Sequence, residues 1–313
     1  MALNQIKDGV MAKSYVWLDG RFIDSEKAVV PISTHSLQYG SGIFEGIRAY
    51  STAKGPAVFR LKEHAARFIR TAKIAGMQLG CIQKELEEAI LEIVEKNKLA
   101  SCYIRPFGFY NDPRIGLDTE GKKISVAVIA VPFGNYFGDK DKGITCKISS
   151  MRRINSQILP PQAKLSGNYA TSVMASKEAK NSGAEEAIML STNGWVAEGP
   201  GENLFLVEEN KLLTPSKESD ILLGITRDSV LKIAESIGIT VEERLVHREE
   251  LLTADELFFS GTAAEITPIV SVDKVRIGKG KPGPITKIIQ ERFTEIVSGK
   301  DPEFAHWLTF TKQ

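Results

Sequence analysis

Apolar residues recur with two periods along the first part of the chain, and each period predicts a different element. Residues 61–77 and 85–96 place apolar side chains three to four positions apart, which is typical of amphipathic helices. Residues 15–22 carry aromatic and β-branched side chains around Asp19-Gly20, a pair that favours a two-residue hairpin turn. Further strands are expected at 43–50, 102–110 and 124–131.

The pattern changes at PFGNYFGDKDKG (132–143), where three glycines and a cluster of charges indicate a linker. Beyond it, strands are expected at 145–149, 186–190, 203–208 and 211–214, and helices at 170–181, 226–237 and 284–297. The interpretation is an α+β chain with a small N-terminal domain (1–133), a linker (134–142) and a larger C-terminal domain (143–313). A cleft between two such domains is the default place for a ligand.

GKGKPG (278–283) fits the spacing of a dinucleotide-binding loop, G-x-G-x-x-G, but lacks its context. The helix predicted after it has no following strand, and Pro282 and Pro284 stiffen the loop. We therefore expect a turn there and no dinucleotide site.

Composition narrows the class of protein. The sequence has 313 residues, 42% of them hydrophobic, and its 40 basic and 39 acidic residues give a net charge of +1. This balance is typical of a globular protein and leaves no basic surface for nucleic acid or an anionic membrane. The N-terminal segment lacks the apolar core of a signal peptide, and Cys81, Cys102 and Cys146 show no CxxC spacing. A cytoplasmic location is expected, and the four scattered histidines predict no metal site.

Lys164 is the only charged residue between Arg153 and Lys177. A loop lysine usually faces water. A lysine that is buried or lies near another cation loses its proton more readily, and its amine then serves as a base or a Schiff-base nucleophile. Both interpretations of Lys164 are open from this segment alone.

Four other segments carry residues that suit one aldehyde cofactor. Pyridoxal 5′-phosphate needs a Schiff-base lysine, a partner for its ring nitrogen and donors for its phosphate. Glu198 in WVAEGPGENLF is a candidate for the ring nitrogen, although an isolated carboxylate at such a turn is usually solvated. Arg67, Thr226 at a predicted helix N-terminus and Thr262 in SGTAAEITP are candidates for the phosphate. Spacing in sequence does not show that these residues meet in space.

The segments HSLQYGSGIFEGIRAY, FRLKEHAARF, YIRPFGF, AKLSGNY, NGWVAEGPGENLF, GITRDSV and SGTAAEITPI follow one another along the chain. In this order they resemble the branched-chain amino-acid aminotransferases, which are fold-type IV (class IV) pyridoxal-phosphate enzymes. The resemblance runs from YVWLDGRF to GPITKIIQERF and implies a fold-type IV enzyme with its cofactor in the cleft between a smaller and a larger α/β domain.

The resemblance also implies roles at matching positions. Lys164 would form the Schiff base and move the α-proton, Glu198 would pair with the ring nitrogen, and Tyr169 would lie near the ring oxygen. The phosphate would be held by Arg67, Ile225, Thr226 and Thr262. The substrate would contact Tyr39, Phe44, Gly46, Tyr103, Arg105, Tyr136, Thr262 and Ala263. In this family each site is built across a homodimer, with Tyr39 supplied by the neighbouring subunit, and higher homo-oligomers remain open.

The implied reaction moves the amino group of L-leucine, L-isoleucine or L-valine to 2-oxoglutarate in a ping-pong cycle. Two alternatives remain open: a D-amino-acid aminotransferase or aminodeoxychorismate-lyase-like enzyme of the same fold, and a non-catalytic homologue that binds pyridoxal phosphate. Phe133 stands where family members often have tryptophan, and FYNDPRIGLDTEG is variable in the family. Both departures leave the side-chain preference open.

Overall fold

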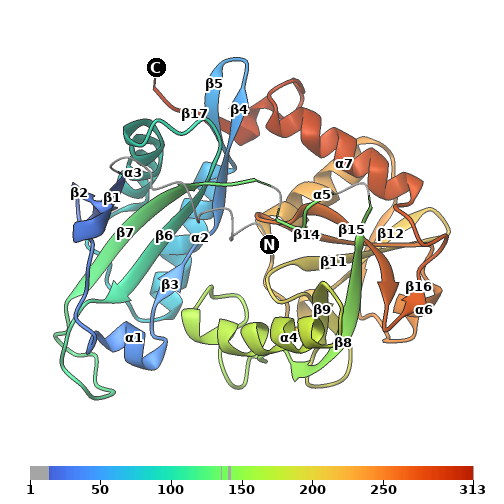
Figure 1. Cartoon of the computed structure of the whole chain (residues 1–313), viewed down its shortest axis with the longest axis horizontal. Helices are drawn as coiled ribbons and strands as arrows, with labels where there is room; N and C mark the ends of the chain where they lie inside the picture. The colour runs from blue at the N-terminus through green and yellow to red at the C-terminus, as the bar shows by residue number, and fades with distance from the viewer. Residues whose placement is uncertain (1–13, 135, 140–141, 313) are drawn as a thin grey trace. The chain divides into compact units, whose positions relative to one another are not determined.

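The computed structural model describes residues 14–134, 136–139 and 142–312. These residues form two compact units (Figure 1). The N-terminal unit comprises 14–134, 163–167 and 296–312, and the C-terminal unit comprises 136–139, 142–162 and 168–295. The predicted domains 1–133 and 143–313 stay a prediction, and residues 135, 140 and 141 of the predicted linker lie outside the described residues.

The N-terminal unit is built on a sheet whose strand pairings are all antiparallel among the described residues. Its strands are β1 (Tyr15–Leu18), β2 (Arg21–Asp24), β3 (Ile43–Phe44), β4 (Ile47–Thr52), β5 (Gly55–Phe59), β6 (Cys102–Tyr110), β7 (Ile124–Pro132) and β17 (Leu308–Phe310). Their order is β17-β5-β4-β6-β7-β1-β2, with β3 paired to β6. Figure 1 shows β17, from the end of the chain, lying beside β5.

The hairpin predicted at Asp19-Gly20 is confirmed. Both residues have positive φ (47° and 85°), as a two-residue turn matched to the strand twist requires, and Val16 pairs with Ile23. The strand expected over 43–50 is wrong as one element, because the chain breaks pairing between β3 and β4. Glu45 at the break turns a fully buried carboxylate toward other side chains.

Three helices belong to the N-terminal unit: α1 (His35–Tyr39), α2 (Leu61–Ile74) and α3 (Gln83–Lys96). The predicted apolar face of α2 is buried at Leu61, Ala65 and Phe68. Helix α2 ends earlier than predicted because Gly76 adopts φ 67°, the left-handed conformation that terminates helices. Helices α2 and α3 pack together on the sheet and enclose a core that includes Phe68.

The C-terminal unit is built on a second sheet, which is mixed: β8 pairs in parallel with β9 and β15, and β14 pairs antiparallel with β11 and β15. Its strands are β8 (Ile144–Arg152), β9 (Glu186–Leu190), β10 (Val196–Glu198), β11 (Asn203–Glu208), β12 (Lys211–Pro215), β13 (Val241–Arg244), β14 (Glu256–Gly261), β15 (Glu265–Val272) and β16 (Val275–Arg276). They follow the order β10-β9-β8-β15-β14-β11-β12-β13, with β16 on β15. Because β10 also pairs with β11, six of these strands close into a ring.

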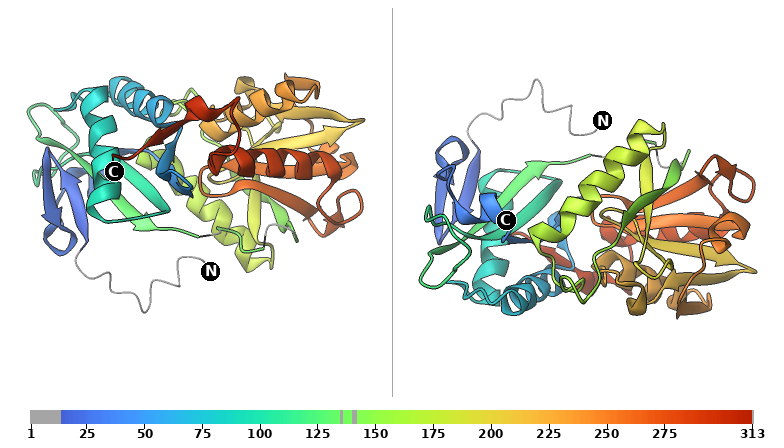
Figure 2. Two further views of the ribbon diagram at one scale, coloured as in Figure 1. Left: turned by 90° about the horizontal axis from the view of Figure 1, so that it is seen from above. Right: turned by 90° about the horizontal axis from the view of Figure 1, so that it is seen from below.

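The helices of this unit are α4 (Tyr169–Asn181), α5 (Ile225–Ser236), α6 (Glu250–Thr253) and α7 (Pro284–Val297), which begins here. Helix α4 packs against β8 and β9, with Ala175 and Ala179 in one apolar cluster with Ala187 and Met189 of β9, and Figure 1 and Figure 2 show α4 beside β8. GKGKPG forms a turn before α7, as expected, with Gly278 and Gly280 at positive φ. In the part of the chain that the structure describes, no helix is both long and apolar enough to cross a membrane.

Candidate active site

Lys164 lies in a short extended segment that pairs with β3 of the N-terminal unit. The Phe44 N–H donates to the Lys164 carbonyl (3.1 Å), and the Ser166 N–H donates to the Gly42 carbonyl (2.8 Å). The Lys164 N–H donates to the Thr71 hydroxyl on α2 (3.2 Å). The side chain is half-buried, and its Nζ lies 4.9 Å from the centroid of the Phe44 ring. Lys164 is therefore anchored at both its N–H and its carbonyl, and it is not an ordinary surface lysine.

Arg67 is four residues before Thr71 and so lies on the same face of α2. It is only 5% exposed, and its guanidinium binds the Glu45 carboxylate side-on, with Nε–Oε1 at 2.6 Å and Nη2–Oε2 at 2.8 Å. His64, also on α2, donates from Nδ1 to Glu45 Oε2 (2.8 Å). One face of α2 thus contributes Arg67 and His64 to a buried cluster with Glu45. This cluster lies next to Thr71, which binds the backbone of Lys164.

The protonation states of this cluster follow from its burial and its charges. Burial alone would raise the pKa of Glu45, but the Arg67 charge and hydrogen bonds, with the His64 hydrogen bond, bring it well below its usual range. Burial is the largest effect on His64 and lowers its pKa, although the hydrogen bond to Glu45 raises it. The charges of Arg67 and Lys164 lower the pKa of His64 further. At neutral pH we therefore take Glu45 as ionised and His64 as neutral.

Tyr103 and Arg105 point to the same side of β6, as their spacing predicts. Arg105 Nη2 donates to the Tyr103 hydroxyl (2.9 Å), and its guanidinium carbon lies 4.6 Å from the centroid of the Phe44 ring. Gly46 adjoins them, because a Cβ at this position would collide with the Tyr103 hydroxyl. Among the described residues, Arg105 Nε is a buried donor with no hydrogen-bond partner. The N-terminal unit therefore brings together two aromatic rings, Phe44 and Tyr103, with Gly46 and the guanidinium of Arg105. We call this group the aromatic wall.

In the C-terminal unit, Glu198 ends β10 and is 5% exposed. Arg153 Nη2 binds its Oε1 (2.7 Å), the Asn203 side-chain amide donates to its Oε2 (2.9 Å), and the Leu222 N–H donates to its Oε2 (3.2 Å). Arg153 also donates to the Ser172 hydroxyl on α4 (3.3 Å). Such a set of donors favours the ionised form of a buried carboxylate.

Helix α5 begins after a residue that cannot cap it with a side chain. Gly224 is its N-cap residue and has no side chain to offer, while Ile225 and Thr226 in the first turn are buried. The first N–H groups of a helix, together with its dipole, bind anions.

Thr262 and Ala263 form the half-buried turn between β14 and β15. The Thr267 hydroxyl donates a hydrogen bond to the Ala264 carbonyl (2.7 Å) and so closes this turn.

The remaining predicted residues have simpler surroundings. Tyr169 is the first residue of α4 and is half-buried, and Tyr136 stacks edge-on against Phe137 with centroids 4.6 Å apart. Tyr39 is 40% exposed, and its hydroxyl accepts a hydrogen bond from the Gly116 N–H (3.2 Å). The predicted site residues therefore fall into two groups. The N-terminal unit contains Tyr39, Phe44, Gly46, Arg67, Tyr103, Arg105 and Lys164, and the C-terminal unit contains Tyr136, Tyr169, Glu198, Ile225, Thr226, Thr262 and Ala263.

The sequence did not single out the residues that hold these groups in place: Glu45, His64, Thr71, Arg153 and Asn203. A signal was present in two cases. Glu45 is one carboxylate inside the apolar run GIFEGI, and Asn203 directly follows Glu202 at the start of an apolar strand. A charged or amide side chain at such a place needs a buried partner.

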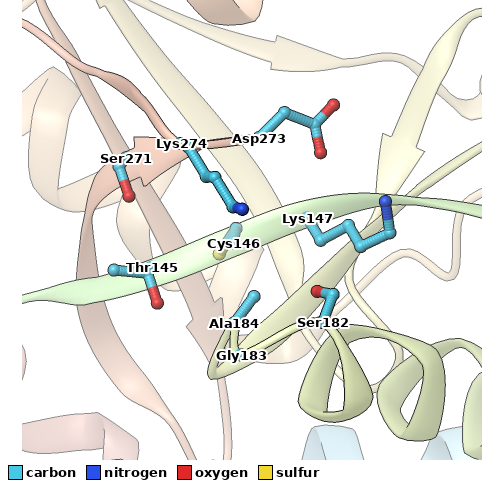
Figure 3. Close-up of a pocket in the computed structure, with 9 residues that line it drawn as sticks. All are labelled: Thr145, Cys146, Lys147, Ser182, Gly183, Ala184, Ser271, Asp273 and Lys274. Atoms are coloured by element: carbon cyan, nitrogen blue, oxygen red, sulfur yellow. The ribbon is translucent and has the colours of Figure 1, made fainter.

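A separate hollow of about 410 Å³ lies in the C-terminal unit, and Figure 3 shows the residues that line it. Its lining residues are Thr145, Cys146, Lys147, Ser182, Gly183, Ala184, Ser271, Asp273 and Lys274, and none of them is a predicted site residue. The Asp273 carboxylate in this lining already has a partner within the protein, because it accepts a hydrogen bond from the Ile148 N–H (3.1 Å). We assign no chemistry to this hollow.

Comparisons with known proteins agree with the motifs. The family model for amino-transferase class IV matches residues 42–272. A branched-chain-amino-acid aminotransferase of Escherichia coli (strain K12) is 42% identical over 302 residues, covering 96% of this chain and 98% of that protein. A solved branched-chain aminotransferase of Thermoproteus uzoniensis with norvaline superposes with a TM-score of 0.92 at 44% identity, covering 96% and 100% of the two chains. The T.th. branched-chain amino acid aminotransferase, complexed with N-(5'-phosphopyridoxyl)-L-glutamate, gives a TM-score of 0.92 at 42% identity, covering 96% and 99%.

Proposed function

The chain belongs to the class IV aminotransferase family, and from this membership we propose that it is a branched-chain-amino-acid transaminase dependent on pyridoxal 5′-phosphate. It transfers the amino group of L-leucine, L-isoleucine or L-valine to 2-oxoglutarate and so forms branched-chain 2-oxo acids and L-glutamate. The observation that carries the proposal is its similarity, over nearly the whole length, to branched-chain aminotransferases, one of them solved with a phosphopyridoxyl-glutamate adduct.

The donor chemistry of both units fits this cofactor. The N-terminal unit supplies a primary amine on Lys164, whose backbone N–H binds Thr71 of α2, and the buried cation Arg67 on the same helix. The C-terminal unit supplies a buried carboxylate, Glu198, and the N-terminus of α5, whose N-cap residue Gly224 has no side chain. When bound, pyridoxal phosphate carries the amino group and withdraws electrons from the substrate α-carbon.

The residues of the chain then have distinct tasks. Lys164 would hold the cofactor covalently through its ε-amine and would move the α-proton of the substrate. Glu198 would pair with the ring nitrogen and keep it protonated, with Arg153 and Asn203 binding the carboxylate oxygens in place. Tyr169 would lie near the ring oxygen. The phosphate would be bound by Arg67, the backbone of Ile225 and Thr226, and Thr262.

Substrate binding is assigned to the aromatic wall of the N-terminal unit and the β14–β15 turn. Phe44 and Gly46 border the side-chain pocket, with Tyr136 as a further contact, and the donors of Tyr103, Thr262 and Ala263 serve the α-carboxylate. Arg105 serves the distal carboxylate of 2-oxoglutarate, since its guanidinium binds Tyr103 and Phe44 while its buried Nε has no hydrogen-bond partner among the described residues.

The active protein is proposed to be a homodimer, with Tyr39 contributed by the neighbouring subunit, and any higher assemblies build on that dimer. Large apolar side chains in the N-terminal unit support this: Val29, Ile32, Ile115 and Leu117 are each at least 76% exposed. A contiguous exposed apolar patch marks an interaction surface, and the dimer proposal places these side chains in one. A cytoplasmic location is part of the proposal, supported by the free thiols of Cys81, Cys102 and Cys146.

The decisive experiment is the visible absorption spectrum of the purified protein with pyridoxal phosphate before and after L-leucine is added. Conversion of the bound aldehyde cofactor to its aminated form, with release of the 2-oxo acid, is the expected result. D-alanine is the matched control. Conversion by D-alanine and not by L-leucine would assign the chain to the D-amino-acid branch of the fold, and no conversion by either would contradict a transaminase of this class.

A further inference from the structure

Asn203 joins two parts of the C-terminal unit that the proposed function assigns to different ends of the cofactor. Its side-chain amide donates one hydrogen bond to Glu198 Oε2 (2.9 Å) and the other to the Leu222 carbonyl (2.8 Å). The Leu222 N–H in turn donates to Glu198 Oε2 (3.2 Å). The three residues close a ring of hydrogen bonds in which both N–H groups of the amide are used. Asn203 is 6% exposed, so water does not replace these bonds.

The Asn203 side chain also borders Gly224, the N-cap residue of α5. A Cβ on Gly224 would collide with Asn203 Oδ1, and its next neighbour would be Asn203 Cγ. Gly224 has φ −70° and ψ 142°, a conformation that every L-residue adopts. The backbone therefore does not require glycine at this position. The space taken by the Asn203 amide does.

We infer that Asn203 is a positioning residue that fixes the Glu198 carboxylate relative to the N-terminus of α5. The inference rests on the proposed function, in which Glu198 meets the ring nitrogen and α5 meets the phosphate. A rigid cofactor binds well at both ends only if these two partners keep a fixed separation. Asn203 fixes that separation directly, because its one side-chain amide binds Glu198 and Leu222 and also borders Gly224, the N-cap residue of α5.

This arrangement predicts that Asn203 and Gly224 act as one unit. Asn203→Ala removes the bond to Glu198 and leaves the part-buried Leu222 carbonyl without this donor, so the affinity for pyridoxal phosphate falls about tenfold or more. Gly224→Ala displaces the intact amide and causes a loss of similar size. In the Asn203→Ala background the colliding atoms are gone, and Gly224→Ala then costs only the small penalty of alanine at an N-cap, about threefold.

The test is a double-mutant cycle of N203A, G224A and the pair, with the dissociation constant of pyridoxal phosphate as the readout. The visible absorption spectrum of the bound cofactor is the second readout, because it reports the surroundings of the ring and not the general stability of the fold. Gly80→Ala is the matched control: Gly80 has no atom within 4 Å of an added Cβ, so the same chemical change leaves affinity and spectrum unaltered.

The expected result is a loss at G224A that shrinks by at least threefold when N203A is present, with the same spectral change in both single variants. An equal loss from G224A in both backgrounds, or full affinity in N203A, would overturn the inference. If N203A does not fold, Asn203→Ser enters the same cycle and the same criteria decide. Turnover of L-leucine by the wild-type protein is measured alongside, so that a failed inference is distinguished from a failed assignment of function.

Discussion

Replacing Glu45 with glutamine tests whether the buried cluster on α2 is a fixed ionic unit. Glu45 is 0% exposed and accepts two hydrogen bonds from Arg67 and one from His64. Glutamine keeps the shape but removes the negative charge and turns an N–H₂ group toward donors. The Arg67 cation is then buried without its counter-charge, which costs about 3–5 kcal/mol. Against a total stability of about 5–15 kcal/mol for a domain, this is a large fraction.

A matched control lies at the start of the same helix. Glu63 also binds a buried arginine at 2.6 Å, Arg60 Nε, but the Glu63 carboxylate is 43% exposed, so water reaches this pair. Water and salt screen such a pair, and Glu63→Gln should cost less than about 1 kcal/mol. Both variants are compared with the wild-type protein by urea unfolding, followed by fluorescence and circular dichroism. Equal losses for Glu45→Gln and Glu63→Gln would refute the view that burial determines the strength of the pair.

The pH dependence gives an independent check. The folded-state pKa of Glu45 is below its unfolded value, so its contribution to stability is fully present above the unfolded pKa and is lost as the pH falls. The difference in free energy of unfolding between the wild type and Glu45→Gln should therefore stay constant from about pH 8 to pH 6. It should begin to narrow below about pH 4.5. The pKa of His64 is also lowered, so its neutral form stabilises the fold above about pH 6.5 and this contribution declines as the pH falls. A difference that widens toward low pH would contradict this assignment of charges.

Three further predictions concern the proposed chemistry. Lys164→Ala should abolish turnover, and borohydride should no longer fix the cofactor to the protein, as mass spectrometry of the reduced protein would show; fixation at another lysine would contradict the assignment. Glu198→Ala should retain some cofactor but lose one to two decades in kcat, since a charge-assisted hydrogen bond contributes about 1.5–3 kcal/mol; an unchanged kcat would point to another partner of the ring nitrogen, with Glu202 as the next candidate. Arg105→Gln should leave the leucine half-reaction within a few-fold and slow the 2-oxoglutarate half-reaction about tenfold or more in single-turnover kinetics. Equal losses in both half-reactions would make Arg105 structural.

Local elements were predictable from the sequence where the pattern is long and the turn chemistry is explicit. The predicted 102–110 strand and the predicted 284–297 helix match β6 and α7 at both ends, and the Asp19-Gly20 hairpin forms as expected. The mixed α/β fold expected from the resemblance is confirmed by the solved relatives. The prediction of one strand over 43–50 was wrong, because the alternation of apolar and polar residues does not reveal a buried carboxylate. Glu45 interrupts the strand and binds Arg67 on a helix.

Long-range pairings were not predictable. The parallel pairing of β8 with β9 and with β15, and the closure of β10 onto β11, join segments whose own sequences specify a strand but not a neighbour. The same holds for residues 163–167, which belong to the N-terminal unit although they come after β8. The sequence marked Lys164 as unusual, but only the pairing with β3 and the bond to Thr71 explain how its backbone is held.

Each of the two units holds a proposed cofactor-binding side chain in place by a buried ion pair. In each, a residue proposed to hold the cofactor is bound by an oppositely charged, buried partner from a distant part of the sequence: Arg67 by Glu45, and Glu198 by Arg153. Buried ion pairs contribute little net stability, because removing both charges from water costs about as much as their attraction returns. Well-packed apolar residues would stabilise the fold equally well. These pairs are therefore better explained by the geometry they impose, since a guanidinium fork or a carboxylate held at both oxygens has a single orientation in which to meet a phosphate or a protonated ring.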